Sequence, residues 1–411
     1  MNLVIVKADS IRIGQPLPFT LRDEGGVMLA NKGYVVRSRA DLDQIVALRG
    51  ELYIDVAESE SHHRAYMGKL YDLVREDRTL GKIAGAQISA SDLDSNRDTG
   101  NAGEPDWLDL QEQTHAMLRD SNPASFSHRL AKIQTQLRRH SHLNPDGTLF
   151  ALFHLSASEV RLYSATHAML VSVMCSLAAR EVLKWPTELE DTLCNAALTM
   201  NIGMTDLQDR LAQQKEALSP EQRRQIDRHA EKSRDMLEQL GVSDPVWLEA
   251  VLDHHTNKPG PLGARASVGL RLARLIQRAD MFAACLAPRA SRVPAAPATA
   301  MQACYFDENR QIDEAGAALI KAVGIYSPGS FVRLFNNEIA VVIKRGANTT
   351  TPRVALLINR SGMPTGEPIV RDTSQPEFRI VASVAHRDVK VKINLERLLL
   401  LTKSPAADRI W

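Results

Sequence analysis

Histidine is the residue type in this chain best suited to chemistry, because its imidazole ligates metal ions and titrates near neutral pH. Five of the twelve histidines fall in one apolar part of the sequence, at His154, His167, His229, His254 and His255. A single histidine on a helix is more often a packed or surface residue than a ligand. The adjacent pair His254-His255 is more informative, although neighbours on a helix point about 100° apart and need further ligands to hold one ion.

The cysteines are less promising. Cys175, Cys194, Cys285 and Cys304 are widely spaced, and no two of them form a C-x-x-C pair, so neither a zinc knuckle nor a redox dithiol is indicated. Three of the four lie in apolar, helix-like stretches, where a free cysteine packs as a small hydrophobic residue. Any chemistry in this chain is therefore expected to rest on the histidines.

Composition narrows the classes of partner. The 50 basic and 49 acidic residues leave a net charge of +1, so no general attraction to a nucleic acid polymer or an anionic membrane is expected. The first residues carry charge and lack the apolar core of a signal peptide. No run approaches the ~18 apolar residues of a membrane span; residues 168–182 come nearest and include Arg180 and Glu181. We expect a cytoplasmic protein with no membrane span.

The histidines need a scaffold, and residues 145–325 predict one that is almost wholly helical. Breakers such as Trp185-Pro186, Ser219-Pro220 and Gly241 divide this region into several helices. Apolar residues recur at helical spacing within it, as in Leu170, Val173, Met174 and Leu177, and again in Leu272, Leu275, Ile276 and Ala279. This pattern predicts an all-α bundle that carries the histidines on its helices.

The flanking regions have different patterns. Residues 1–56 alternate apolar and polar positions between turn signals, and predict a small strand-rich α/β unit. Residues 57–144 predict a helical connector with a flexible linker at 87–106, which is rich in Ser, Asp, Asn and Gly. Residues 326–403 contain β-type runs separated by turn residues, and predict a small β-barrel-like unit. The expected fold class is therefore multidomain α+β.

Taken in order, the segments around the histidines resemble the HD-GYP family, a branch of the HD phosphohydrolases that hydrolyses cyclic di-GMP at a centre of two or three metal ions. The family line runs H…HDxGK…H…HHExxDGxGYP…ARIxxxAD, with an Arg beyond the last Asp. Here AALTMNIGMTDLQDRL stands at the HDxGK position, DHHTNKPGPLGARAS at the HHE…GYP position and GLRLARLIQRADMF at the ARIxxxAD helix. The resemblance covers about 150–325, and the β segment after it is also common behind this domain.

This resemblance implies roles for particular residues. Metal ligands would be His167, His229, His254, His255 and Asp280. Arg289, nine residues beyond Asp280, would face the phosphates of a nucleotide through the fixed donors of its guanidinium. Because His229, His254 and His255 would together hold one ion of the family's pair, a single Fe, Mn or other divalent metal stays open as a cofactor.

The departures from the family line concern catalysis. Met200-Asn201 replaces the paired His-Asp, so a bridging carboxylate becomes a neutral amide, and a thioether is a soft ligand poorly suited to Fe or Mn. Met204 replaces the Lys, which removes a cation near the phosphate. Thr256 replaces the Glu after the histidine pair, Ala283 replaces a second Asp, and the GYP sequence is absent. We therefore predict that no catalytic set assembles, since in-line hydrolysis depends on its metal ions.

Three functions stay open at this point. The first, which we expect, is a catalytically inactive regulatory or adaptor protein in bacterial cyclic-dinucleotide signalling, which binds a partner protein, cyclic di-GMP or another nucleotide. The second is a phosphohydrolase with a rebuilt one-metal site, and the third is a scaffold whose histidines are relics. Metal analysis separates the second function from the others, and a nucleotide titration separates the first from the third.

Overall fold

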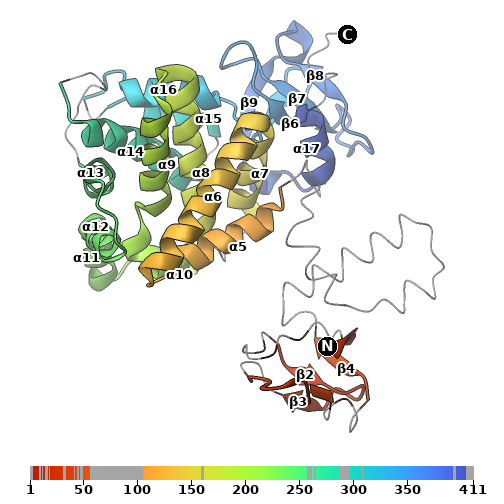
Figure 1. Cartoon of the computed structure of the whole chain (residues 1–411). Coiled ribbons are helices and arrows are strands. Elements are labelled where there is room, and N and C mark those ends of the chain that lie inside the picture. Colours follow the sequence, from red (N-terminus) through yellow and green to blue (C-terminus); the bar gives the residue numbers. More distant parts are fainter. Residues whose placement is uncertain are drawn as a thin grey trace. The chain divides into compact units, whose positions relative to one another are not determined.

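The computed structural model of the chain divides into two compact units, Met1–Pro105 and Asp106–Trp411 (Figure 1). The structure describes residues 3–8, 11, 13, 17, 19–30, 34–40, 42–43, 46, 50–55, 105–158, 162–256, 262, 265–286, 297–307, 309–391 and 395–403. Most of the predicted linker 87–106 and all of 57–86 lie outside the described residues.

The first unit contains a four-stranded antiparallel sheet in the order β1-β4-β2-β3. Its strands are β1 (Leu3–Val6), β2 (Leu21–Arg22), β3 (Met28–Ala30) and β4 (Leu52–Asp55). In β1 the buried side chains alternate with half-buried ones, as expected of a strand with one face on a core. That core includes Val6, Phe19, Leu21, Val36, Leu52 and Ile54. The sheet predicted for residues 1–56 is confirmed.

The second unit begins with two helices from the predicted connector. Asp106 caps α5 (Trp107–Met117), and Asn122 caps α6 (Pro123–Leu143) by accepting from backbone N–H groups of the first turn. Trp107 on α5 and Phe126 on α6 are buried in the same core as the rest of the helical bundle. The boundary predicted between 144 and 145 therefore does not separate two compact units.

The bundle itself is built around α8, all of whose residues are buried. By length and composition alone, the stretch Tyr163–Leu183 could cross a membrane, but 78% of its apolar window is buried inside the protein. The other elements are α7 (Pro145–Ser158), α8 (Tyr163–Leu177), a π-helix (Ala178–Leu183), α9 (Thr187–Thr199), the 3-10 turn η4 (Ile202–Met204), α10 (Thr205–Gln213), α11 (Pro220–Asp227), α12 (His229–Gln239), α13 (Pro245–Asp253), α14 (Val268–Leu286), α15 (Pro297–Tyr305) and α16 (Glu314–Val323). The predicted central helical domain is confirmed.

The predicted breakers act as helix boundaries. Pro186 precedes α9, and Ser219 forms a capping box with Gln222 at the start of α11, where Pro220 fills the first helical position. That position tolerates proline because its N–H has no partner within the helix. Gly241, just past α12, has a φ of 88°, a conformation that glycine adopts without steric cost.

The C-terminal strands form an open antiparallel sheet, which corrects the barrel-like unit that we expected. The order is β8-β7-β6-β5-β9, and within the described residues no pairing joins β8 to β9. One face packs on α7 and α17 (Figure 1), so this sheet is covered without closing. The elements are β5 (Phe331–Leu334), β6 (Ile339–Lys344), β7 (Arg353–Ile358), β8 (Val370–Asp372), β9 (Ile380–Val384) and α17 (Leu395–Lys403).

The sheet and the bundle share one core. Phe331 and Val341 belong to the same buried cluster as the helices. At the edge of this joint, Arg345 binds Asp146 at 2.7 Å and Glu181 at 2.8 Å. Residues 326–403 are thus part of the second compact unit.

Candidate metal centre

Three histidines meet where one helix begins and the next one ends. His229 is the first residue of α12, and His254 follows the last residue of α13 with His255 next to it. The potential ligand atoms of the three side chains all lie within 4.8 Å of one another. His229 and His254 are buried, whereas His255 is exposed. The structure therefore brings together the three residues that the resemblance assigns to one ion.

Backbone hydrogen bonds set the tautomers of the two buried rings. Nδ1 of His229 donates to the carbonyl of Ile226, and Nδ1 of His254 donates to the carbonyl of Val251 at 2.6 Å. Because a carbonyl can only accept, each neutral ring carries its proton on Nδ1 and has a lone pair on Nε2. The two Nε2 atoms lie 3.2 Å apart. Two facing lone pairs at that distance repel each other, and a cation bound by both would relieve the repulsion.

The environment favours the neutral form of these imidazoles. Burial lowers the pKa of His254 to about 3, and the nearby charges of His255 and His229 act in the same direction. Burial also lowers the pKa of His229, against the effect of its hydrogen bond to Ile226. A neutral imidazole is the form that binds a metal ion, so this cluster has the chemistry of a ligand set.

His167 and Asp280 form a separate pair beside the three histidines. Nε2 of His167 on α8 lies 2.6 Å from Oδ1 of Asp280 on α14. Burial alone would raise the pKa of Asp280, but the hydrogen bond and charge of His167, together with His255 and His254, hold it below its usual range. The carboxylate of Asp280 is thus already paired with a side chain of the protein, His167.

Tyr163 supports this pair, and the sequence reasoning missed it. Its ring stacks on His167 with the centroids 5.4 Å apart and the planes inclined by 20°. Tyr163 precedes His167 by four residues in α8, so both side chains lie on one face of the helix. That spacing was a signal available in the sequence.

Met200 and Asn201 occupy the end of α9, with Met200 at its C-cap. Both side chains are buried, and among the described residues Oδ1 of Asn201 has no hydrogen-bond partner. Together with His167 they line a void that is too small to hold a water molecule. An unpaired buried amide oxygen costs about 1–3 kcal/mol, and in this chain it stands at the position where the resemblance implies a bridging carboxylate.

Gly203 sets how closely this segment approaches the helix of His229. A Cβ atom at Gly203 would lie 2.8 Å from the backbone N of Ser233 and 3.0 Å from the carbonyl of His229. The backbone N–H of Gly203 donates to Oγ of Ser233 at 3.0 Å. Only glycine allows η4 to pack on α12 at this distance, so Gly203 positions Asn201 relative to the histidines.

The remaining predicted site residues are dispersed. Met204 is half-buried in a groove whose walls include none of the three histidines. Arg289 lies outside the described residues, so its expected contact with phosphates stays a prediction. Thr256, which stands in place of the family's Glu, bonds to Asp253 at 2.9 Å and accepts a hydrogen bond at its carbonyl from Gln277 at 3.3 Å. Gln277 is a second supporting residue that the sequence reasoning missed.

The donor set fits one metal ion and does not fit a pair. Three imidazole nitrogens that converge within 4.8 Å suit a divalent transition metal. A second ion would need a bridging carboxylate and a further histidine at positions that hold Asn201 and Met200. His167 and Asp280, the other expected ligands, are bonded to each other.

Comparison with known proteins finds similarity in the region that carries the three histidines. Residues 154–316 match the family model described as an HD domain. The cyclic di-GMP phosphodiesterase PA4108 of Pseudomonas aeruginosa is 26% identical over 267 residues, which are 62% of this chain and 62% of that protein. The chain thus spans about three fifths of the length of this curated relative. A solved structure of Bd1817, an HDG"Y"P protein from Bdellovibrio bacteriovorus, has a TM-score of 0.42 and 15% identity, and covers 77% of this chain and 98% of that one. Residues 154–316, which include the three clustered histidines, thus match an HD domain, and the chain is similar to a cyclic di-GMP phosphodiesterase.

Proposed function

We propose that this chain is a cytoplasmic regulatory or adaptor protein of cyclic-dinucleotide signalling that does not hydrolyse cyclic di-GMP. The observation that carries the proposal is the buried Met200-Asn201 segment at the end of α9. Hydrolysis by a pair of metals needs ions that activate water and clamp the attacking and leaving oxygens. A neutral amide and a thioether supply neither the charge nor the bridging geometry for that pair.

Two further observations support the loss of hydrolysis. His167 and Asp280 pair with each other at 2.6 Å, and the void that His167 lines together with Met200 and Asn201 has no room for a water molecule. The setting in signalling is supported by the relative from P. aeruginosa, which is named a cyclic di-GMP phosphodiesterase. A protein that keeps the fold and loses the reaction is suited to recognition.

A hydrolysis assay tests the proposal. The full chain, purified without chelator and supplied with Mn²⁺ or, under anaerobic conditions, Fe²⁺, is incubated with cyclic di-GMP and with its linear product. We expect both nucleotides to stay intact. Turnover in the wild type that disappears in a His254→Ala variant would overturn the proposal, because it would show that the histidine cluster catalyses the reaction.

The proposal also includes binding of a nucleotide without hydrolysis. Arg289 is the residue that the resemblance assigns to phosphates, and hydrogen bonds to charged groups contribute roughly 1.5–3 kcal/mol. Calorimetry with cyclic di-GMP and other nucleotides is expected to show binding without hydrolysis, weakened by that amount in Arg289→Ala. If no nucleotide binds at sub-millimolar concentration, recognition of a partner protein is the role that the proposal retains.

A one-metal phosphohydrolase is the second candidate function. It is favoured by the two Nε2 lone pairs of His229 and His254, which face each other at 3.2 Å. A divalent ion bound there would supply Lewis acidity toward a phosphoester oxygen, and the backbone bonds at Nδ1 would hold the rings in the ligating orientation. The test is a panel of phosphomonoesters and phosphodiesters. Activity that follows metal loading and is lost in His229→Ala would favour this candidate.

A further inference from the structure

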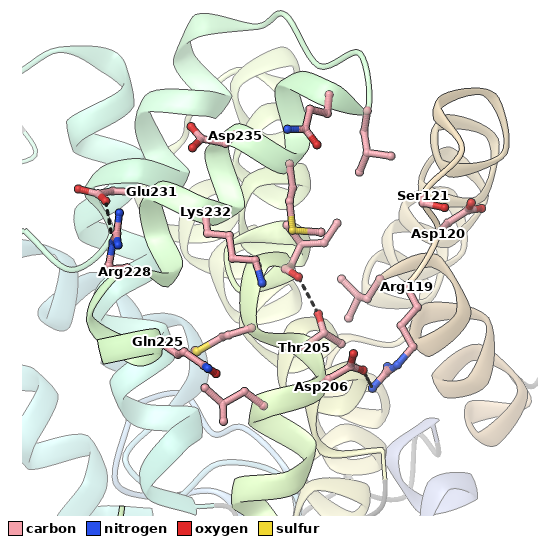
Figure 2. A pocket seen from close by; sticks show the side chains of 18 of the residues that line it. Arg119, Asp120, Ser121, Thr205, Asp206, Gln225, Arg228, Glu231, Lys232 and Asp235 are labelled. Atoms are coloured by element: carbon pink, nitrogen blue, oxygen red, sulfur yellow. Dashed lines mark hydrogen bonds and ion pairs between the residues drawn. The ribbon is translucent and has the colours of Figure 1, made fainter. Parts of the chain in front are cut away.

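A large groove lies apart from the three histidines. Its volume is about 880 Å³, and its walls come from the turn at 118–121 between α5 and α6, from η4 and α10, and from α11 and one stripe of α12 (Figure 2). None of the three clustered histidines, nor His167 or Asp280, is among the residues that line it. The groove is therefore lined by other residues than the candidate centre, although α12, which begins at His229, contributes to both.

Arginine partners neutralise the acidic side chains in the walls. Arg119 forms ion pairs at 2.8 Å with both Asp206 and Asp209. Asp206 lines the groove, whereas Asp209 does not. Glu221 pairs with Arg224, an adjacent residue of the groove. The other pairs are Asp120–Arg129 at 3.3 Å, Glu231–Arg228 at 3.9 Å and Asp235–Arg234 at 2.6 Å. Among the described residues that line the groove, every carboxylate therefore has a basic partner.

Two cations in the walls have no such partner. Within the described residues, the side chains of Arg210 and Lys232 form no hydrogen bond and no ion pair, and both are exposed. Figure 2 shows the side chain of Lys232 extending into the groove between Arg228 and Thr205. Unpaired positive charges in a concave surface attract anionic groups. The groove is thus suited to a ligand that carries negative charge.

The walls of the groove also include apolar side chains. Met204 and Met236 are half-buried there, and methionine adapts its shape to varied apolar ligands. None of the described residues that line the groove is aromatic, whereas sites that bind unpaired bases use aromatic side chains for stacking. These features favour a peptide over a nucleotide.

We infer that this groove binds an acidic amphipathic segment of a partner protein. The apolar side chains of that segment would lie against Met204 and Met236, and its carboxylates would pair with Lys232 and Arg210. This recognition mode places an amphipathic helix in a groove, with apolar anchors at spacings of three and four residues. The inference rests on the proposed function, because it specifies the chemistry of the partner that the regulatory protein recognises.

A displayed library of random peptides of about 16 residues, roughly four helical turns, tests the inference on the full chain. We expect selected peptides to combine Asp or Glu with apolar residues at helical spacing. Synthetic copies are then titrated in fluorescence anisotropy, and their affinity is expected to fall as salt rises. The double variant Arg210→Glu/Lys232→Glu should lower the affinity about tenfold or more, because like charges then meet across the interface.

A matched control and a charge exchange make the test specific. Lys132 and Arg139 are exposed cations on α6 outside the groove, so Lys132→Glu/Arg139→Glu should bind the peptides as the wild type does. Peptides in which every Glu becomes Lys should prefer the Arg210→Glu/Lys232→Glu variant. Circular dichroism of each variant checks that it is folded.

Three results would overturn the inference. They are selected peptides without acidic residues, equal binding to the wild type and the groove variant, and displacement of the peptides by cyclic di-GMP. Hydrolysis of cyclic di-GMP by the wild type would instead overturn the proposed function and leave peptide binding unaffected. If no peptide binds, only the inference about the groove fails and the proposed function is unaffected. The two failures are therefore distinguishable.

Discussion

At the scale of single residues, the candidate centre is a ligand set that is complete for one ion and incomplete for two. His229 and His254 present Nε2 lone pairs 3.2 Å apart, because both rings donate from Nδ1 to the carbonyl three residues earlier. Asn201, at the end of α9, has an amide oxygen without a partner among the described residues. The neighbouring thioether of Met200 adds no charge. We therefore predict that the identity of these two residues limits how many ions the site can hold.

Restoring the family residues should recover metal without recovering hydrolysis. The double variant Met200→His/Asn201→Asp returns an imidazole and a carboxylate to the segment beside His167, so the metal content per chain, measured by elemental analysis, should rise. Cyclic di-GMP should still stay intact, because the lysine at 204 and the GYP sequence are missing. The control is Met200→Leu/Asn201→Leu, which should not gain metal. Recovery of hydrolysis in the double variant would contradict this account.

At the scale of the elements, two close joints hold the site and the C-terminal sheet in place. One is the approach of η4 to α12 at Gly203, where a Cβ would meet the backbone of Ser233 at 2.8 Å. The other joins α7 to the sheet, where the rings of His154 and His386 lie 6.1 Å apart and His386 also lies against Phe331, at 5.2 Å. A prediction follows from each of these two contacts.

Gly203→Ala should destabilise the protein. The added methyl group has no room against the α12 backbone, and overpacking of this kind costs about 1–3 kcal/mol. Urea unfolding should show that loss as a lower midpoint. Gly366→Ala is the matched control, because nothing lies within 4 Å of a Cβ there. Equal midpoints for the two variants would show that η4 can move away from α12.

The joint at α7 should make stability depend on pH. Burial lowers the pKa of both His154 and His386, and for His154 the charge of His386 adds to the effect. The unfolded chain therefore takes up protons at a higher pH than the folded chain. The contribution of these two histidines to the free energy of unfolding is present above the ordinary pKa of about 6.5 and is lost as the pH falls below it.

Unfolding by urea at about pH 7.5 and about pH 5.5 measures this contribution. The variant His154→Gln/His386→Gln should lose less stability between the two pH values than the wild type. His128→Gln, which replaces an exposed histidine of α6, should behave as the wild type does. If the double variant keeps the full pH dependence, the other buried histidines account for it.

Much of this arrangement could be predicted from the sequence, and the rest depends on tertiary contacts. The helical region and its breakers at Pro186, Ser219-Pro220 and Gly241 follow from periodicity and turn chemistry. The tautomers of His229 and His254 and the pairing of His167 with Asp280 depend on distances across helices, which spacing does not encode. A closed barrel was wrongly expected because strand runs indicate a sheet without indicating whether its edge strands pair.

At the scale of the whole molecule, one continuous apolar core supports the second unit. The core runs from Trp107 on α5 through α8 to Val341 on β6, and each large side chain buried in it contributes roughly 1.5–3 kcal/mol. An ion in the centre would lie at one end of this core, between α12 and α13. We therefore expect the fold not to depend on metal in the way that a small zinc domain does.

Removal of metal should leave the melting temperature nearly unchanged. Differential scanning calorimetry with and without a chelator is expected to give a shift of less than about 3 °C, since a change of ~1 kcal/mol moves the midpoint of a domain this large by only a few degrees. His254→Ala with the same chelator is the control for effects unrelated to the site. A large drop in the wild type alone would show that an ion is structural.

The number of metal ions per chain tests the central claim most directly. Elemental analysis of the wild type, purified without chelator and loaded with Mn²⁺, Fe²⁺ or Zn²⁺ before removal of the excess, is compared with that of His254→Ala. The account predicts no more than one ion per chain in the wild type, and the loss of any such ion in the variant. Two tightly bound ions per chain would contradict it, because they would mean that Met200 and Asn201 do not prevent the binuclear centre.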